Sequence, residues 1–155
     1  MPSLKLPILG KTLWLTGDVL LRAELTLLLR TNQQTWESAF FRVDPGTEMT
    51  TMPASNAKKL DLPMPQNPVP GLVMNLPGGQ GTGEVRAGII RAQVPGLDNT
   101  EHIFPCYFVG DPNQVPPTTP KNLLGLSGVV DKIRITFDGT AVPGCPYGQM
   151  LLEKI

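Results

Sequence analysis

The sequence has no excess of charge of either sign. Its 155 residues include 13 Lys and Arg against 13 Asp and Glu, with a single His. A balanced chain lacks the strong positive field with which many nucleic-acid-binding proteins attract phosphate backbones. We therefore expect no nucleic-acid partner. Because 41% of the residues are hydrophobic and only 17% are charged, the composition also excludes an intrinsically disordered chain.

Cysteine and long apolar runs are also scarce. Cys106 and Cys145 are the only cysteines, and neither a Cys-x-x-Cys pair nor a second His accompanies them, which excludes the common zinc and disulfide frameworks. We expect two reduced thiols, no metal and no cofactor. Charged residues interrupt the Leu-rich N-terminal part before it reaches the about 20 apolar residues of a spanning helix. The sequence therefore predicts a soluble, cytoplasmic protein without a membrane partner.

Glycine and proline, by contrast, are abundant, with 16 and 17 residues. Their frequency favours short strands joined by turns over long helices. Apolar residues alternate with other residues over 19–30, which predicts a strand with one buried face. A hairpin turn at 31–34 and a returning strand at 35–43 follow. Further strands are predicted at 72–76, 83–94, 100–109, 133–137 and 147–155.

Several local features refine this outline. The apolar phase of 83–94 shifts by one position, which predicts a bulge near Ile89. Pro105 places its strand at a sheet edge or a bulge. Helical turns are predicted at 53–62 and 127–133. No repeat or composition shift marks a second domain, so we expect residues 1–155 to form a single all-β domain.

The segment "AFFRVDPGTEMTTMP" (39–53) places Asp44 at the end of an apolar strand, directly before Pro45 and Gly46. Alone, Asp-x-Gly is ordinary turn chemistry, and that interpretation stays open. The combination is more specific. An apolar strand leads into Asp-x-Gly-Thr, a glycine-tipped hairpin follows at 77–83, and an apolar pair followed by Gly, "LLG", comes far downstream.

In chain order, "FFRVDPGTEMTTMP", "NLPGGQGTGEV" and "NLLGLSGVVDKIRITFDG" resemble three segments of the retropepsin-like aspartic proteases, the family of the retroviral proteases and their cellular and bacterial relatives. These segments are the catalytic loop, the flap and a later supporting segment. The resemblance covers residues 25–139. It implies a closed acid-protease β-barrel with one or two short helical turns, and an aspartic endopeptidase that works as a homodimer on a peptide or protein substrate.

The resemblance also implies roles for individual residues. Asp44 is the catalytic acid. The residues expected to form and support its loop are Pro45, Gly46, Thr47, Leu123, Leu124 and Gly125. The residues expected in a flap over bound peptide are Gly78, Gly79, Gln80 and Gly81. For the flap, a simple flexible hairpin is the alternative, and Thr47 is either a donor to the Asp44 carboxylate or a plain turn residue.

Only Asp44 among the aspartates has this context, whereas an aspartic protease activates water between two carboxylates that share a proton. The mechanism therefore requires a symmetric homodimer with one Asp44 from each chain. In this family terminal strands commonly build the dimer sheet, which makes the segments 1–9 and 147–155 candidates for the contact.

Pro45 departs from the family, which has Thr or Ser between Asp and Gly. In the family that hydroxyl and its backbone N–H brace the two loops across the dimer, and proline has neither group. Three interpretations stay open. The dimer is braced elsewhere and active; or the domain is catalytically impaired and serves as a peptide-binding or dimerisation module; or Pro45 is an introduced substitution.

For the single histidine and the two tryptophans we expect structural positions without a functional role. His102 stands alone and is expected at an exposed strand position. Trp14 and Trp36 are expected in the core or on a sheet face.

Overall fold

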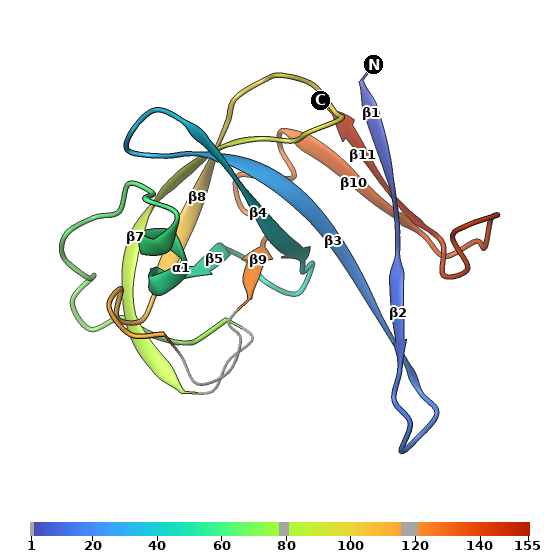
Figure 1. The fold of residues 1–155 in the computed structure, drawn as a ribbon, viewed down its shortest axis with the longest axis horizontal. Helices are drawn as coiled ribbons and strands as arrows, with labels where there is room; N and C mark the ends of the chain where they lie inside the picture. The colour runs from blue at the N-terminus through green and yellow to red at the C-terminus, as the bar shows by residue number, and fades with distance from the viewer. Residues whose placement is uncertain (1, 78–80, 116–120) are drawn as a thin grey trace.

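The computed structural model describes residues 2–77, 81–115 and 121–155 (Figure 1). Strands dominate this part of the chain, and its one helix is short, which confirms the all-β prediction. No helix in the described ranges is long and apolar enough to cross a membrane. In chain order the elements are β1 (Ser3–Pro7), β2 (Leu9–Thr12), β3 (Val19–Arg30), β4 (Trp36–Val43), β5 (Thr50–Pro53), α1 (Ala54–Lys59), β6 (Val73–Asn75), β7 (Thr82–Gln93), β8 (His102–Val109), β9 (Asn122–Leu124), β10 (Ile133–Asp138) and β11 (Gln149–Lys154).

Six strands close into a ring that holds the core. Their order is β3-β4-β9-β5-β8-β7, and β7 returns to β3 through the pairs Leu28–Gln93 and Leu29–Ala92. Every second side chain of these strands points inward, where it loses contact with water. The largest core residues contributed by the ring are Leu27, Leu29, Phe41, Met52, Phe104 and Phe108, all fully buried.

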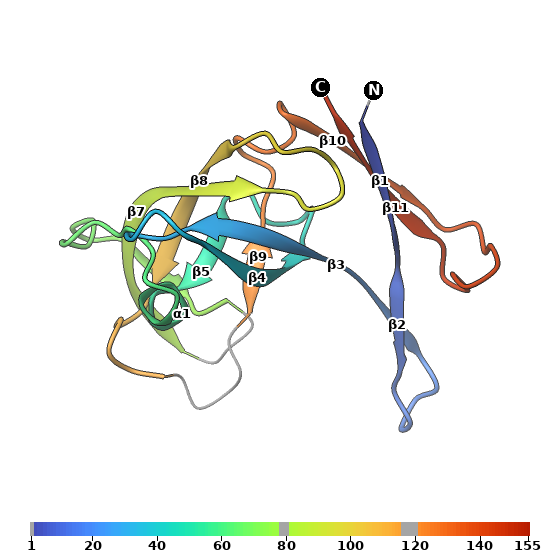
Figure 2. The same cartoon turned by 45° about the horizontal axis from the view of Figure 1, so that its top comes forward.

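The strand β3 confirms the predicted alternation only along part of its length. Ala23, Leu25, Leu27 and Leu29 are buried, because they lie inside the ring. Val19 and its neighbours are exposed, because this end of β3 leaves the ring and pairs with β2 alone. Residues 9–22, which we call the β2–β3 arm, project away from the body in both ribbon views (Figures 1 and 2).

The two tryptophans have different environments. Trp14 lies in the turn at the tip of the arm with 87% of its surface exposed, so the expectation of a core or sheet-face position is wrong for this residue. Trp36 begins β4 and is half-buried, and the guanidinium carbon of Arg30 lies 5.2 Å from its ring centre. A loop tip has no second layer to cover a large side chain, which is why Trp14 remains in water.

A second, three-stranded sheet joins the two ends of the chain. β11 lies between β1 and β10, and both pairings are antiparallel. The termini therefore lie side by side (Figures 1 and 2). Met150 and Leu152 of β11 are fully buried and belong to the same core cluster as the ring. Apolar packing therefore holds this sheet against the body.

A polar cluster adds to this attachment. His102 is buried rather than exposed, which corrects the expectation from the sequence, and its ring stacks on Phe104 with 5.7 Å between centres. Its Nε2 lies 3.8 Å from Asp98 Oδ1, while Lys154 Nζ lies 3.1 Å from Asp98 Oδ2 and donates to Thr100 Oγ1. Burial lowers the pKa of His102, although the Asp98 carboxylate opposes that effect. Burial alone would raise the pKa of Asp98, but hydrogen bonds from Thr100 and Lys154 lower it overall.

The predicted bulge near Ile89 is wrong. β7 and β8 pair without interruption from Val85–Val109 to Ala92–His102. The shift in apolar phase has another cause: Val85 is buried on one face of β7, whereas Ile90 and Ala92 are buried on the other. Different neighbours cover the two faces at the two ends of this long strand.

The placement of β8 also differs from the prediction. It lies between β5 and β7 and not at an edge. Pro105 is accommodated because β5 pairs only with Cys106–Val109, so the proline falls outside that ladder.

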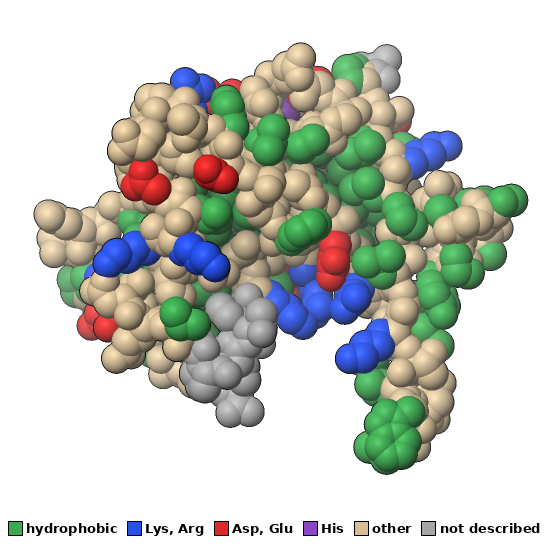
Figure 3. Space-filling model, viewed as in Figure 1, with side chains coloured by type: hydrophobic (Ala, Val, Ile, Leu, Met, Phe, Trp, Pro, Cys, Tyr) green, Lys and Arg blue, Asp and Glu red, His purple; other side chains and the backbone are tan. Residues whose placement is uncertain are grey.

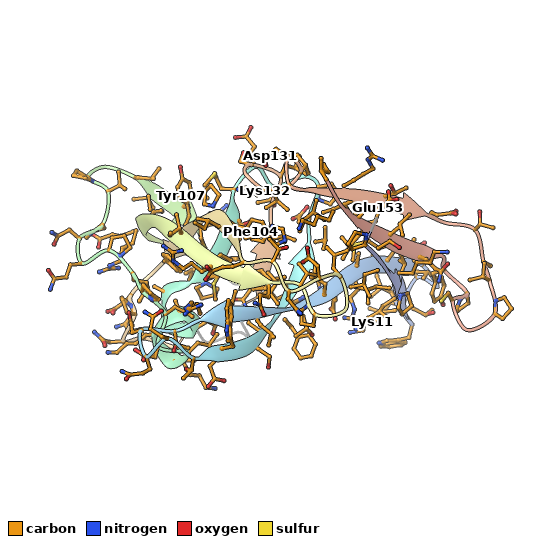
Figure 4. The ribbon with its side chains drawn as sticks, turned by 90° about the horizontal axis from the view of Figure 1, so that it is seen from above. Lys11, Phe104, Tyr107, Asp131, Lys132 and Glu153 are labelled. Atoms are coloured by element: carbon orange, nitrogen blue, oxygen red, sulfur yellow. The ribbon has the colours of Figure 1, made fainter. Side chains whose placement is uncertain are left out.

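The segment 127–133 forms successive turns and no helix, whereas the helix α1 lies within the predicted 53–62. Val129 is buried beneath these turns. Lys132 closes them, because its Nζ donates to the carbonyl oxygens of Gly128 (2.8 Å) and Ile103 (2.7 Å). The same ammonium lies 5.7 Å from the ring centre of Phe104 (Figure 4). The turns are therefore tied to β8.

Candidate active site

Asp44 directly follows β4 and heads a short exposed loop. Its backbone N–H donates to Leu124 O at 3.0 Å, and its side chain is half-buried, whereas Pro45 and Gly46 are exposed. The loop's own donors hold the carboxylate. Gly46 N–H donates to Oδ1 (3.0 Å) and the Thr47 hydroxyl to Oδ2 (2.8 Å), as predicted for Thr47. Both oxygens are therefore oriented without any contribution from the side chain at position 45.

The three-residue strand β9 supports this loop from below. It pairs in parallel with β4, through Phe41–Asn122, Arg42–Leu123 and Val43–Leu124. On its other side Leu123 pairs with Thr51 of β5. The segment therefore lies between the strand that enters the Asp44 loop and the strand that leaves it. Leu123 and Leu124 thus lie between the two strands that flank the Asp44 loop, and Leu124 is buried.

Gly125 lies so close to the loop that a side chain would not fit. A Cβ atom on this residue would lie 2.5 Å from the carbonyl carbon of Met49 and 2.8 Å from Glu48 O. Its N–H donates to Thr50 Oγ1, a fully buried acceptor, at 3.1 Å. The absence of a Cβ atom at position 125 thus permits a direct backbone contact.

The residues after Gly125 continue the contact. Leu126 N–H and Ser127 N–H both donate to Glu48 O, at 3.0 and 2.7 Å. Asn122, at the other end of β9, donates from Nδ2 to Phe40 O (3.0 Å) and accepts from Asn56 Nδ2 of α1 (3.1 Å). Backbone and side-chain bonds therefore fix both ends of the supporting segment.

Sequence reasoning did not single out Thr50 or Asn122. The available signal was weak: Thr50 is the first of two threonines in a four-residue strand, and Asn122 precedes the apolar pair. Neither pattern indicates which distant group will be the partner.

The glycine-tipped hairpin consists of β6 and β7, which pair from Val73–Glu84 to Asn75–Thr82. Gly81 has φ +92°, a conformation that glycine adopts readily, and its carbonyl accepts from Leu76 N–H at 3.0 Å. The other three residues expected in the flap, Gly78, Gly79 and Gln80, lie outside the described residues. The structure thus provides the base of the predicted hairpin.

Other kinds of site find little support in the described ranges. No group of three or more His, Cys, Asp or Glu side chains gathers there as a metal site would require. Cys106 is buried, and its burial raises the pKa of the thiol, so the reactive thiolate form is disfavoured. Within the described residues Asp44 forms no ion pair, and its carboxylate accepts hydrogen bonds from Gly46 and Thr47 of its own loop.

Comparison with protein-family models and with curated proteins finds no match to this sequence.

Proposed function

We propose that this chain is a retropepsin-like aspartic endopeptidase, in which Asp44 and the Asp44 of a second copy activate water. The observation that carries the proposal is the insertion of β9 between β4 and β5, which holds the Asp44 loop by backbone bonds from both sides. A loop held in this way presents its carboxylate in one orientation, as catalysis between two fixed carboxylates requires.

The chemistry follows from two carboxyl groups that share one proton. The ionised carboxylate takes a proton from water as the water oxygen attacks the scissile carbonyl carbon, and the protonated partner donates to the carbonyl oxygen. Collapse of the tetrahedral intermediate breaks the C–N bond, and the amine leaves with a proton from the pair. In each copy the Gly46 and Thr47 donors would keep the carboxylate in place through these steps.

The terminal sheet bears on how two copies would meet. β11 is paired on both edges within its own chain, so it offers no free edge. In the described part of the molecule, β1 is paired on one edge only. Of the two terminal segments, β1 is therefore the better candidate, and its antiparallel pairing with a second β1 would satisfy two-fold symmetry.

A second function, a peptide-binding or dimerisation module, is favoured by Pro45. Proline cannot supply a hydroxyl or an N–H across a dimer. We nevertheless prefer the enzyme, because the donors that orient Asp44 come from Gly46 and Thr47 of its own loop and leave the carboxylate geometry independent of residue 45.

The test compares the unaltered chain, Asp44→Asn and Pro45→Ser against a fluorescence-quenched peptide library from acidic to neutral pH, with sedimentation as a parallel measure of assembly. We expect cleavage by the dimer, its loss in Asp44→Asn, and equal or faster cleavage by Pro45→Ser. Cleavage that persists in Asp44→Asn, or a strictly monomeric protein, would refute the proposal. Cleavage by Pro45→Ser alone would show a protease scaffold disabled at one site, whereas no cleavage by any form, with tight peptide binding retained, would favour the binding module.

A further inference from the structure

The outer face of β3 and β4 carries cationic side chains beside Asp44. Phe40 and Arg42 lie at alternate positions of β4, so their side chains leave the same face of the strand, and Asp44 directly follows that strand. β3 adds Arg22 and Glu24 to that face, because Glu24 lies directly opposite Arg42 in the pairing of the two strands. Two arginines therefore lie on the outer face of the strand pair that leads into the Asp44 loop.

A cavity of about 430 Å³ opens on this face. This volume lies within the about 300–1,000 Å³ that is common for ligand pockets. Figure 3 shows Lys and Arg side chains gathered in the hollow between the body and the β2–β3 arm. The cavity lining includes Arg22, Glu24, Phe40, Arg42, Lys121 and Asn122. Three cations thus face one acid, in a chain whose formal net charge is zero.

The two arginines are not satisfied within the described residues. The Nε atoms of Arg22 and Arg42 are buried without a hydrogen-bond partner there. Arg22 Nε lies 3.3 Å from Glu24 Oε1, which is ion-pair distance without hydrogen-bond geometry. Buried donors normally have partners, and a lone guanidinium N–H group is costly to leave unpaired. Both arginines also line the cavity, so an acceptor bound there would meet their guanidinium groups.

We propose that this cavity binds the carboxylate of an Asp or Glu side chain in a peptide, next to the bond that Asp44 attacks. The inference rests on the proposed function, and it makes acidic peptides the preferred substrates. A guanidinium offers parallel N–H donors that match the two oxygens of a carboxylate. Phe40, 73% exposed at the same cavity, provides an apolar contact for the methylene groups of the bound side chain.

A peptide fits these observations better than a nucleic acid does. Binding along a phosphate backbone uses an extended run of cations and stacking surfaces. Here the cations line a single open cavity, and Glu24 stands among them. A single carboxylate would neutralise part of the positive charge of the cavity. The successive phosphates of a nucleic acid would in addition repel the Glu24 carboxylate.

The experiment measures binding separately from cleavage. Two labelled peptides of identical sequence, one with Glu and one with Gln at the central positions, are titrated by fluorescence anisotropy into Asp44→Asn protein, which holds the peptide intact. Arg42→Gln and Arg22→Gln are tested in the same background. Arg134→Gln is the matched control, because Arg134 is a surface arginine of β10 that pairs with Glu153 and does not line the cavity. Thermal unfolding verifies that each variant is folded.

We expect the Glu peptide to bind about tenfold more tightly than the Gln peptide, as one charge-assisted hydrogen-bond pair would produce at a half-exposed site. Arg42→Gln and Arg22→Gln should each reduce that preference, and Arg134→Gln should retain it. Equal affinity for the two peptides, a preference that survives both cavity variants, or tighter binding of a single-stranded oligonucleotide would overturn the inference.

The two proposals can fail separately. If the unaltered chain cleaves both peptides equally well and binds them equally, the proposed function stands and the acidic specificity falls. If acidic peptides bind through Arg42 but no peptide is cleaved by any form with Asp44, the cavity assignment stands and the enzyme proposal falls.

Discussion

The close approach of Gly125 to the Asp44 loop predicts that Gly125→Ala will be strongly destabilising. Its Cβ would lie 2.5 Å from Met49 C and 2.7 Å from Met49 O, whereas carbon atoms pack best at about 3.5–4.0 Å. The backbone would have to move by about 1 Å to relieve this overlap, and overpacking of that kind costs about 1–3 kcal/mol. The movement also strains two hydrogen bonds to Glu48 O, each worth about 1 kcal/mol. We expect a total loss of about 3 kcal/mol.

Urea denaturation of Gly125→Ala measures this loss, and Gly139→Ala is the control. A Cβ on Gly139 would have no neighbour within 4 Å, while both substitutions restrict the unfolded chain equally. Peptide cleavage should fall more than stability alone explains, because the strained backbone carries Asp44. If the free energy of unfolding of Gly125→Ala lies within about 0.5 kcal/mol of that of the unaltered protein, the backbone accommodates the extra Cβ without strain. The reasoning about β9 is then wrong.

Three further predictions concern the core and the buried polar groups. Thr50→Val should lower the free energy of unfolding by about 1–3 kcal/mol, because it leaves Gly125 N–H without an acceptor. Thr50→Ser keeps a hydroxyl and should retain most of that stability. Equal losses for the two variants in urea denaturation would exclude the hydrogen bond as the cause. The pKa of His102 is lowered by burial, so the unfolded chain takes up a proton at higher pH than the folded chain does. The free energy of unfolding should therefore decrease as the pH is lowered through about 6.5, by at most about 1.4 kcal/mol per pH unit, and His102→Gln should flatten that profile. Leu27→Ala should cost about 2–5 kcal/mol by thermal or urea unfolding, whereas Leu21→Ala, on the exposed end of the same strand, should change stability by less than about 0.5 kcal/mol.

Local patterns in the sequence predicted the features that depend on local chemistry. The alternation in β3 predicted which of its side chains face the core from Ala23 onward, because one inner face is covered throughout the ring. The support of the Asp44 loop by Leu123, Leu124 and Gly125 followed from resemblance, and their contacts with the loop occur in the structure.

Features that depend on distant segments were not predictable in the same way. The alternation continues to Val19, but nothing local shows that the strand has left the ring by then. His102 is buried because the loop carrying Asp98 and the strand carrying Lys154 cover it. The apparent bulge at Ile89 reflects a change of covering neighbour along β7, which periodicity alone cannot distinguish from a change of register. The alternate positions of Phe40 and Arg42 are visible in the sequence, but the lack of a hydrogen-bond partner for Arg42 Nε within the described residues is not.

The position of β9 determines how much of the chain must be synthesised before the Asp44 loop is held in place. Gly125 and the Thr50 hydroxyl that accepts its N–H lie 75 positions apart. A nascent or truncated chain that ends before residue 122 already carries the acid and its loop donors, yet it lacks the segment that fixes the loop between β4 and β5. On our proposal such a fragment would be inert, so a growing polypeptide could not attack its neighbours before residues 122–127 had left the ribosome and packed against the loop.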